Sequence, residues 1–117
     1  GFLGQDLNLY KRTQMRENMT YSIIKGAIIN YIRQMSSFYG KYKIRVNSIS
    51  PGGLIGHNAG KTKFQNKNFI KNYSNKVPLR RLGKPAEISK SVVFLVSPMA
   101  SYITGTNFIV DGGISIV

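Results

Sequence analysis

The sequence has 117 residues and no cysteine, and its 17 basic and 4 acidic residues give a formal net charge of +13. This length fits one small domain, and the composition excludes a disulfide framework, a thiol nucleophile and a cysteine-bound zinc site. One histidine, His57, and four acids predict no metal site, and no apolar run approaches the roughly 18 residues of a membrane span, so we expect a cytoplasmic protein without a membrane partner.

The first long element predicted along the chain is a helix. Residues 1–17 show no periodicity and are expected to form a lead-in loop. From Asn18, where Asn18 or Thr20 can act as the N-cap, apolar residues recur at steps of three and four up to Tyr39. The pattern predicts a helix over 18–39 with a wide apolar stripe, which Gly40 ends.

A strand and a second, shorter helix are predicted next. Residues 44–49 alternate between apolar and polar side chains and predict a short strand, which Pro51 and the two glycines after it end. Residues 64–73 predict a short helix over a glycine-rich loop. Its expected aromatic contacts are Phe64, Phe69 and Tyr73.

The last elements complete an α/β pattern. Pro85 fits the first position of a helix over 85–96, and the apolar run 107–110 is typical of a strand buried on both faces. The order helix, strand, helix, strand predicts a parallel sheet with a crossover connection.

Two strands are too few for such a sheet, and the stripe on 18–39 needs a wider one to cover it. We interpret residues 1–117 as the C-terminal part of a doubly wound parallel-sheet domain. The first residue is not methionine, so we expect the protein to continue upstream. An exposed strand edge at 44–49 predicts poor solubility of the chain by itself.

Tyr21 and Lys25 are candidates for proton chemistry. Four residues apart, they project from one face near the start of the predicted helix. A neighbouring ammonium group and the positive end of the helix dipole both favour the ionised form of a phenol. The pair can therefore give a proton to a carbonyl oxygen or take one from an alcohol. Tyr39 and Lys43 have the same spacing, so spacing alone leaves a solvated surface pair as the alternative.

Three more motifs follow that pair in order: RVNSISPGG at 45–53, PLRRLGKPAEI at 78–88 and YITGTNFIVDGG at 102–113. The ordered set resembles the short-chain dehydrogenase/reductase family over nearly all of residues 18–117. The resemblance implies the C-terminal part of a Rossmann fold and an NAD(P)-dependent oxidoreductase that moves a hydride between the nicotinamide and a carbonyl or hydroxyl carbon. The long segment 1–17 is similar to bacterial members that modify surface polysaccharides or flagellin sugars, which implies a sugar derivative as the small-molecule substrate.

The same resemblance implies roles for individual residues. Tyr21 is then the catalytic acid/base, and Lys25 supports it and holds the nicotinamide ribose. The backbone of Leu54 bonds the carboxamide of the cofactor, which is NAD or NADP. The full set of implied cofactor-binding residues is Tyr21, Lys25, Pro51, Gly52, Gly53 and Leu54.

Other parts of the chain receive implied structural roles. Asn47 is expected to be structural, and 54–76 is expected to be the substrate loop. The stripe on 18–39, the helix 85–96 and the last strand are expected to form homo-oligomer interfaces.

The sequence also departs from the family pattern. The glycine-rich fingerprint that holds the pyrophosphate is absent, so the N-terminal cofactor-binding half of the domain is missing from the chain. Asn8 stands at the usual spacing of the catalytic serine, and Gly56 stands where a threonine is often found. The chain carries two of the family's four catalytic residues, and we expect it to be inactive by itself.

Several other patterns support competing hypotheses. Residues 56–62 resemble a phosphate-binding loop, but Ile55 occupies the position of its first glycine, so a flexible loop containing His57 is favoured. Arg80 and Arg81 could bind phosphate, although a turn with solvated charges is favoured.

Two alternatives lie outside enzymology. The helix stripe is compatible with a non-enzymatic oligomerisation or interaction module. The charge is compatible with a basic nucleic-acid-binding domain, but the basic residues run from Lys11 to Lys90 in ones and twos, which does not favour a nucleic-acid partner.

Overall fold

The computed structural model describes residues 3–16, 18–56 and 64–117. Within these ranges the chain forms two strands and three α-helices, in the order helix, strand, helix, helix, strand, together with short 3-10 turns. None of these helices is both long and apolar enough to cross a membrane. The elements are α1 (Met19–Tyr39), β1 (Ser48–Pro51), α2 (Lys67–Lys76), α3 (Pro85–Val96) and β2 (Asn107–Val110).

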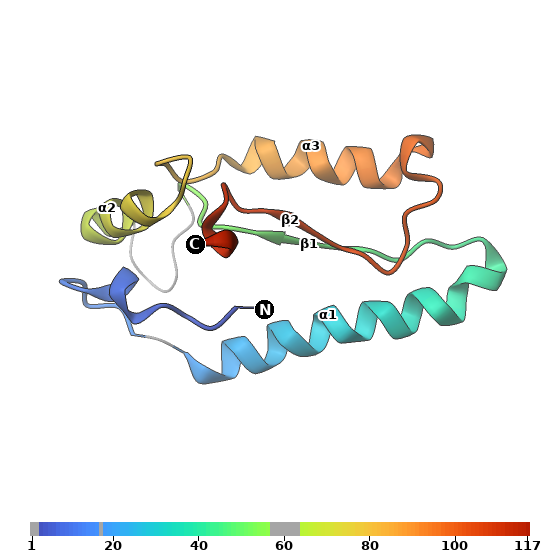
Figure 1. The fold of residues 1–117 in the computed structure, drawn as a ribbon, viewed down its shortest axis with the longest axis horizontal. Helices are drawn as coiled ribbons and strands as arrows, with labels where there is room; N and C mark the ends of the chain where they lie inside the picture. Colours follow the sequence, from blue (N-terminus) through green and yellow to red (C-terminus); the bar gives the residue numbers. More distant parts are fainter. Residues whose placement is uncertain (1–2, 17, 57–63) are drawn as a thin grey trace.

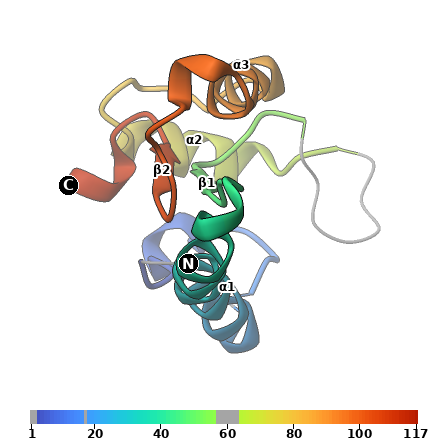
Figure 2. The ribbon, with the colours of Figure 1, turned by 90° about the vertical axis from the view of Figure 1, so that its right-hand side faces the viewer.

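The two strands form a parallel sheet between helices, which confirms the predicted fold class. β1 and β2 pair from Ser48 opposite Asn107 to Pro51 opposite Val110. Figures 1 and 2 show α3 over one face of this sheet and α1 running along the other side. Parallel sheets are covered on both faces because their crossover connections place helices there.

Helix α1 begins where the sequence predicted it. The Asn18 side chain accepts a hydrogen bond from the Tyr21 N–H at 3.3 Å, so Asn18 is the N-cap. The helix ends at Tyr39, but Gly40 keeps a right-handed conformation and opens a 3-10 turn. The left-handed residue that ends this turn is Lys43, with φ 61°.

The predicted strand 44–49 is wrong at both ends, because the strand covers Ser48–Pro51. The residues before it are held by their side chains. The Arg45 guanidinium donates to the Leu95 carbonyl at 2.7 Å and so satisfies a carbonyl at the end of α3. The Asn47 amide donates to the Ile103 carbonyl at 2.9 Å, which is the structural role expected of it.

The predicted helix 64–73 is displaced by three residues. Asn66 caps α2 by accepting hydrogen bonds from two backbone N–H groups of the first turn, so the helix cannot include Phe64. Phe64 is 85% exposed, so the prediction that its ring is a packing contact is wrong. Phe69 and Tyr73 do pack as expected.

The hydrophobic core lies near α2 rather than along α1. Tyr73, Val77 and Leu82 form the buried cluster. Around it pack Leu9, Phe69, Ile70 and Ile114. Most of the α1 stripe stays open within the described ranges, and Ile32 is its buried apolar residue. This distribution agrees with the expectation that α1 needs a wider sheet.

Candidate functional site

The start of α1 and the carboxyl ends of both strands lie at the same end of the molecule (Figure 1). Open parallel α/β sheets bind ligands beyond the carboxyl ends of their strands. The polar residues near the start of α1 and in the turn after β1 are therefore the candidates for a site.

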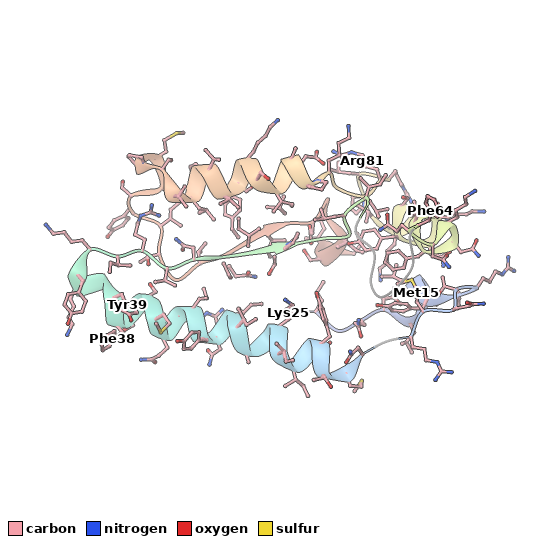
Figure 3. All side chains as sticks on the ribbon, turned by 180° about the vertical axis from the view of Figure 1, so that it is seen from behind. Met15, Lys25, Phe38, Tyr39, Phe64 and Arg81 are labelled. Atoms are coloured by element: carbon pink, nitrogen blue, oxygen red, sulfur yellow. The ribbon has the colours of Figure 1, made fainter. Side chains whose placement is uncertain are left out.

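Tyr21 and Lys25 come together on α1 as the spacing predicted. The Lys25 ammonium nitrogen lies 5.5 Å from the centroid of the Tyr21 ring. Tyr21 is 49% exposed, and Figure 3 shows the Lys25 side chain on the side of α1 that faces the sheet. Neither ion pair found within the described ranges uses Lys25, so its ammonium group stays available to a ligand hydroxyl.

The turn after β1 leaves no room for side chains at its two glycines. A Cβ atom at Gly52 would lie 2.8 Å from the Asp111 Cα, and one at Gly53 would lie 2.7 Å from the Tyr73 ring. Contacts this short are not found for real Cβ atoms, so packing alone requires glycine at both positions. Pro51 ends β1 on the exposed side of the turn.

Leu54 offers a backbone donor in the turn that follows β1. The N–H groups on either side are engaged: Gly53 N–H donates to the Tyr73 hydroxyl and Ile55 N–H to the Gly83 carbonyl at 2.9 Å. Within the residues that the structure describes, the Leu54 N–H has no acceptor. A free N–H between two engaged ones can donate a hydrogen bond to the carbonyl oxygen of an amide ligand such as a carboxamide.

A small cavity lies between this turn and α3. It encloses about 90 Å³ and is lined by Gly52, Gly53, Arg81, Glu87 and Asp111, among others. Ligand pockets for cofactors typically measure several hundred Å³, so this cavity is too small for a nicotinamide nucleotide. Tyr21 and Lys25 do not line it. The candidate site is therefore the open surface beside the turn rather than this cavity.

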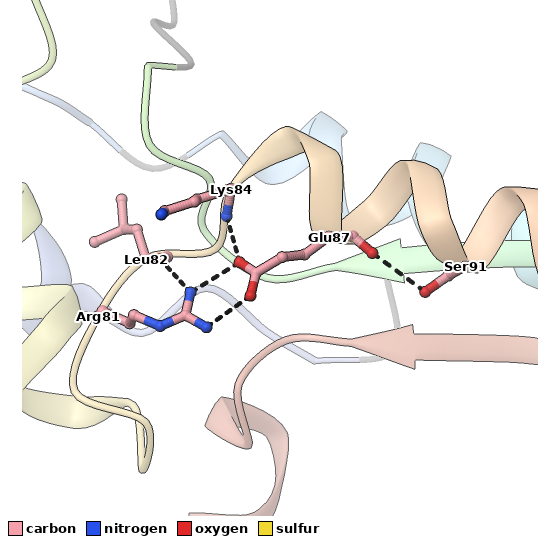
Figure 4. A network of polar contacts seen from close by, with 5 residues as sticks. All are labelled: Arg81, Leu82, Lys84, Glu87 and Ser91. Carbon is pink, nitrogen blue, oxygen red and sulfur yellow. Dashed lines mark hydrogen bonds and ion pairs between the residues drawn. The ribbon is translucent and has the colours of Figure 1, made fainter.

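Arg80 and Arg81 are exposed in a turn, as expected, and Arg81 is in addition paired with an acid. The Arg81 guanidinium binds both carboxylate oxygens of Glu87, at 2.8 and 2.7 Å (Figure 4). Glu87 also accepts the Lys84 N–H at 2.7 Å and so caps α3. Hydrogen bonding to Arg81 lowers the pKa of Glu87 to about 2. Arg80 donates to the Asn75 carbonyl, so neither arginine is free for a phosphate.

The leading segment, residues 3–16 of the chain, joins α1 to α2. Gln5 accepts the Asn18 N–H at 2.8 Å at the start of α1. Asp6 forms an ion pair with Lys76 of α2, and this contact lowers the pKa of Asp6.

Two asparagines of α2 complete the attachment. The Asn72 amide donates to the carbonyls of Leu9 and Lys11 at 3.2 and 2.9 Å, and the Asn68 amide donates to the Arg12 carbonyl at 2.7 Å. Sequence reasoning missed this docking; the asparagine-rich composition of 66–75 was its only signal.

The remaining residues that the sequence analysis singled out lie in turns or outside the described ranges. Asn8 lies in a 3-10 turn, where its amide donates to Asp6 at 3.0 Å. Gly56 has a φ of 78° and its N–H donates to Gln65 at 3.1 Å. His57 and the rest of the phosphate-loop-like run lie outside the described residues. In the described ranges no three His, Cys, Asp or Glu residues gather in a group that could hold a metal ion.

Comparisons with known proteins agree with this geometry. A family model described as enoyl-(acyl carrier protein) reductase matches residues 8–115. The chain is 39% identical over 98 residues to isoepoxydon dehydrogenase of Aspergillus clavatus, covering 82% of this chain and 38% of that protein. It is 40% identical over 95 residues to the 3-oxoacyl-(acyl-carrier-protein) reductase of Chlamydia trachomatis, covering 81% and 37%.

A solved structure supports the same conclusion. A short-chain dehydrogenase of Leptospira borgpetersenii, crystallised with bound NAD+, superposes with a TM-score of 0.77 at 33% identity. The match covers 93% of this chain and 41% of that protein. The chain thus spans about two fifths of the length of the relatives it matches.

Proposed function

Because this chain belongs to the short-chain dehydrogenase/reductase family, we propose that it supplies the proton-transfer part of an NAD(P)-dependent oxidoreductase. The observation that carries the proposal is the contact between Tyr21 and Lys25 in the first turns of α1. The remaining part of the fold, equivalent to the rest of its relatives, would hold the pyrophosphate. By itself the chain would be inactive.

The residues of this chain fit a nicotinamide cofactor at its nicotinamide end. Lys25 would donate hydrogen bonds to the ribose hydroxyls, and the Leu54 N–H would donate to the carboxamide. The side-chain-free turn at Gly52 and Gly53, next to Pro51, would let the ring approach the backbone. When bound, the cofactor exchanges a hydride with the substrate carbon.

Tyr21 would handle the proton that accompanies this hydride. In reduction, the phenol hydroxyl gives its proton to the carbonyl oxygen, which becomes the alcohol oxygen, and the phenolate remains on Tyr21. In oxidation, the phenolate takes the proton back from the alcohol. The Lys25 ammonium nitrogen, 5.5 Å from the centroid of the Tyr21 ring, would supply a positive charge beside Tyr21 in both directions.

The substrate would be a small molecule with a carbonyl or secondary hydroxyl group. The names of the relatives given above indicate dissimilar substrates, which supports a broad class of carbonyl or hydroxyl compounds rather than one compound. We keep a sugar derivative, as in the surface-polysaccharide or flagellin-sugar members, as the finer proposal from the long leading segment. Residues 54–76 would contact the substrate. The complete enzyme would be a cytoplasmic homo-oligomer.

The exposed stripe of α1 favours one second candidate, a non-enzymatic interaction module. Ile23, Ile24 and Tyr31 are all exposed in the described structure and would be covered in a complex. Under this alternative, loss of the Tyr21 hydroxyl would change no activity.

The test is Tyr21→Phe in the enzyme assembled with its dinucleotide-binding half, assayed with NADH and NADPH against a panel of ketones that includes keto sugars. We expect kcat to fall by roughly 10²–10⁴, the contribution of a general acid, with cofactor affinity retained. Tyr42→Phe, at an exposed tyrosine in the 3-10 turn that follows α1, is the matched control. Turnover within about threefold of the unmodified enzyme, a change of about 0.6 kcal/mol in activation free energy, would contradict the proposal.

A further inference from the structure

Tyr73 is a buried phenol on α2 whose hydroxyl has a specific backbone partner. The side chain is 7% exposed, and its oxygen accepts the Gly53 N–H at 2.5 Å. Its ring carbons occupy the space that a Cβ at Gly53 would need, at 2.7 to 2.9 Å. The ring and the hydroxyl therefore both act on the turn that follows β1.

The position of this hydroxyl determines how the next peptide groups are oriented. Tyr73 holds the Gly53 N–H on one side of Leu54, and the Gly83 carbonyl holds the Ile55 N–H on the other. Between these anchors the Leu54 N–H is left without an acceptor in the described part of the chain. The Leu54 N–H shares a planar peptide group with the Gly53 carbonyl, which accepts the Gly83 N–H at 2.9 Å. That bond and the two anchored neighbouring N–H groups together limit the directions in which the Leu54 donor can point.

Burial keeps the Tyr73 hydroxyl in its neutral form. Desolvation raises the pKa of Tyr73, and the negative charge of Asp111 acts in the same direction. A neutral hydroxyl accepts the Gly53 N–H and cannot serve as a base near neutral pH. Its role is therefore to hold the backbone and not to transfer a proton.

We propose that Tyr73 is a positioning residue that orients the Leu54 N–H toward the carboxamide of the nicotinamide, an inference that rests on the proposed function. Since Tyr73 belongs to α2, within the segment proposed to contact the substrate, it also connects that segment to the cofactor turn. α2 is held in turn by the leading segment through Asn72 and Lys76. Through Tyr73, the packing of α2 against the leading segment would therefore affect the affinity for the cofactor.

The main test is Tyr73→Phe in the assembled enzyme, which removes the hydroxyl and keeps the ring. We expect the Kd and KM for NADH to rise roughly threefold to tenfold, as for one lost hydrogen bond. The value of kcat at saturating NADH should change less than the KM, because Tyr73 does not touch the reacting atoms. Tyr102→Phe, at a fully exposed tyrosine, is the matched control. Unchanged NADH affinity in Tyr73→Phe would overturn the proposal.

A second measurement does not depend on activity. Amide hydrogen exchange in the assembled enzyme should be faster at Gly53 in Tyr73→Phe than in the unmodified protein or in Tyr102→Phe. Equal exchange at Gly53 would also overturn the proposal. If Tyr21→Phe abolishes turnover while Tyr73→Phe binds NADH normally, this inference fails alone. If Tyr21→Phe retains turnover, the proposed function fails, whatever exchange Gly53 shows.

Discussion

Glu87 is the residue whose ionisation has a defined consequence for stability. Arg81 holds its pKa near 2, against an ordinary value of 4.5. A carboxyl with a lowered pKa contributes stability that is present above its unfolded-state pKa and is lost as the pH falls through its folded-state pKa. The window for this contribution is therefore between about pH 4.5 and pH 2.

Glu87→Gln removes the charge and the paired contact with Arg81. At pH 6 we expect a lower urea midpoint for the variant than for the unmodified chain. As the pH approaches 2, the urea midpoints of the two proteins should converge. Lys90→Gln, a charge change on the same helix without an ion pair in the described residues, should leave the pH dependence unchanged. If the difference in urea midpoint between Glu87→Gln and the unmodified chain were the same at every pH, the ion pair between Arg81 and Glu87 would not contribute to stability.

The predictability of single residues depended on the distance of their partners along the sequence. Helical spacing predicted that Tyr21 and Lys25 meet, and the motifs that follow them distinguished this pair from Tyr39 and Lys43. The hydroxyl of Tyr73 and the guanidinium of Arg45 bind backbone groups 20 and 50 residues away. No local pattern encodes such contacts, so their roles became visible only in three dimensions.

Among the elements, those with clear chemical signals at their ends were predicted best. α3 and β2 have the predicted bounds, since Pro85 starts the helix and Asp111 with two glycines follows the strand. β1 was misplaced because the alternation at 44–49 arises from side chains that bond to other segments. α2 was misplaced because the prediction followed the aromatic residues from Phe64, whereas the Asn66 side chain caps the helix and fixes its start.

The docking of the leading segment on α2 can be tested with Asn72→Ala. The variant removes two hydrogen bonds to backbone carbonyls, each contributing about 0.5–1.5 kcal/mol. We expect faster tryptic cleavage after Lys11 and Arg12, which lie on this segment and are exposed. Asn75→Ala is the control, because the Asn75 side chain has no hydrogen bond in the described structure. Equal cleavage rates in the two variants would contradict the docking.

For the molecule as a whole, exposed apolar surface is the dominant feature. The side chains of Ile23, Met19 and Tyr31 on α1 are between 60 and 78% exposed, and the described sheet has only two strands. Surface of this kind normally marks an interface. The sequence predicted the uncovered stripe correctly, but it could not show that the core would instead gather around α2.

We expect the isolated chain to self-associate through this surface despite its net charge of +13. Ile23→Lys, at a position 72% exposed, should increase the monomer fraction in light scattering. Asn30→Lys adds the same charge at an exposed polar position of α1 and should have a smaller effect. Equal effects of the two substitutions would assign the change to charge rather than to the apolar surface.

The bonds from Asn68 and Asn72 end on backbone carbonyls and not on side chains of the leading segment. Residues 9, 11 and 12 can therefore drift in identity during evolution without weakening these bonds. The amides themselves have no such freedom. Deamidation of Asn72 would replace a side chain that donates two hydrogen bonds with a carboxylate facing two carbonyl oxygens. This single spontaneous reaction would break a contact that many substitutions in the leading segment would leave intact.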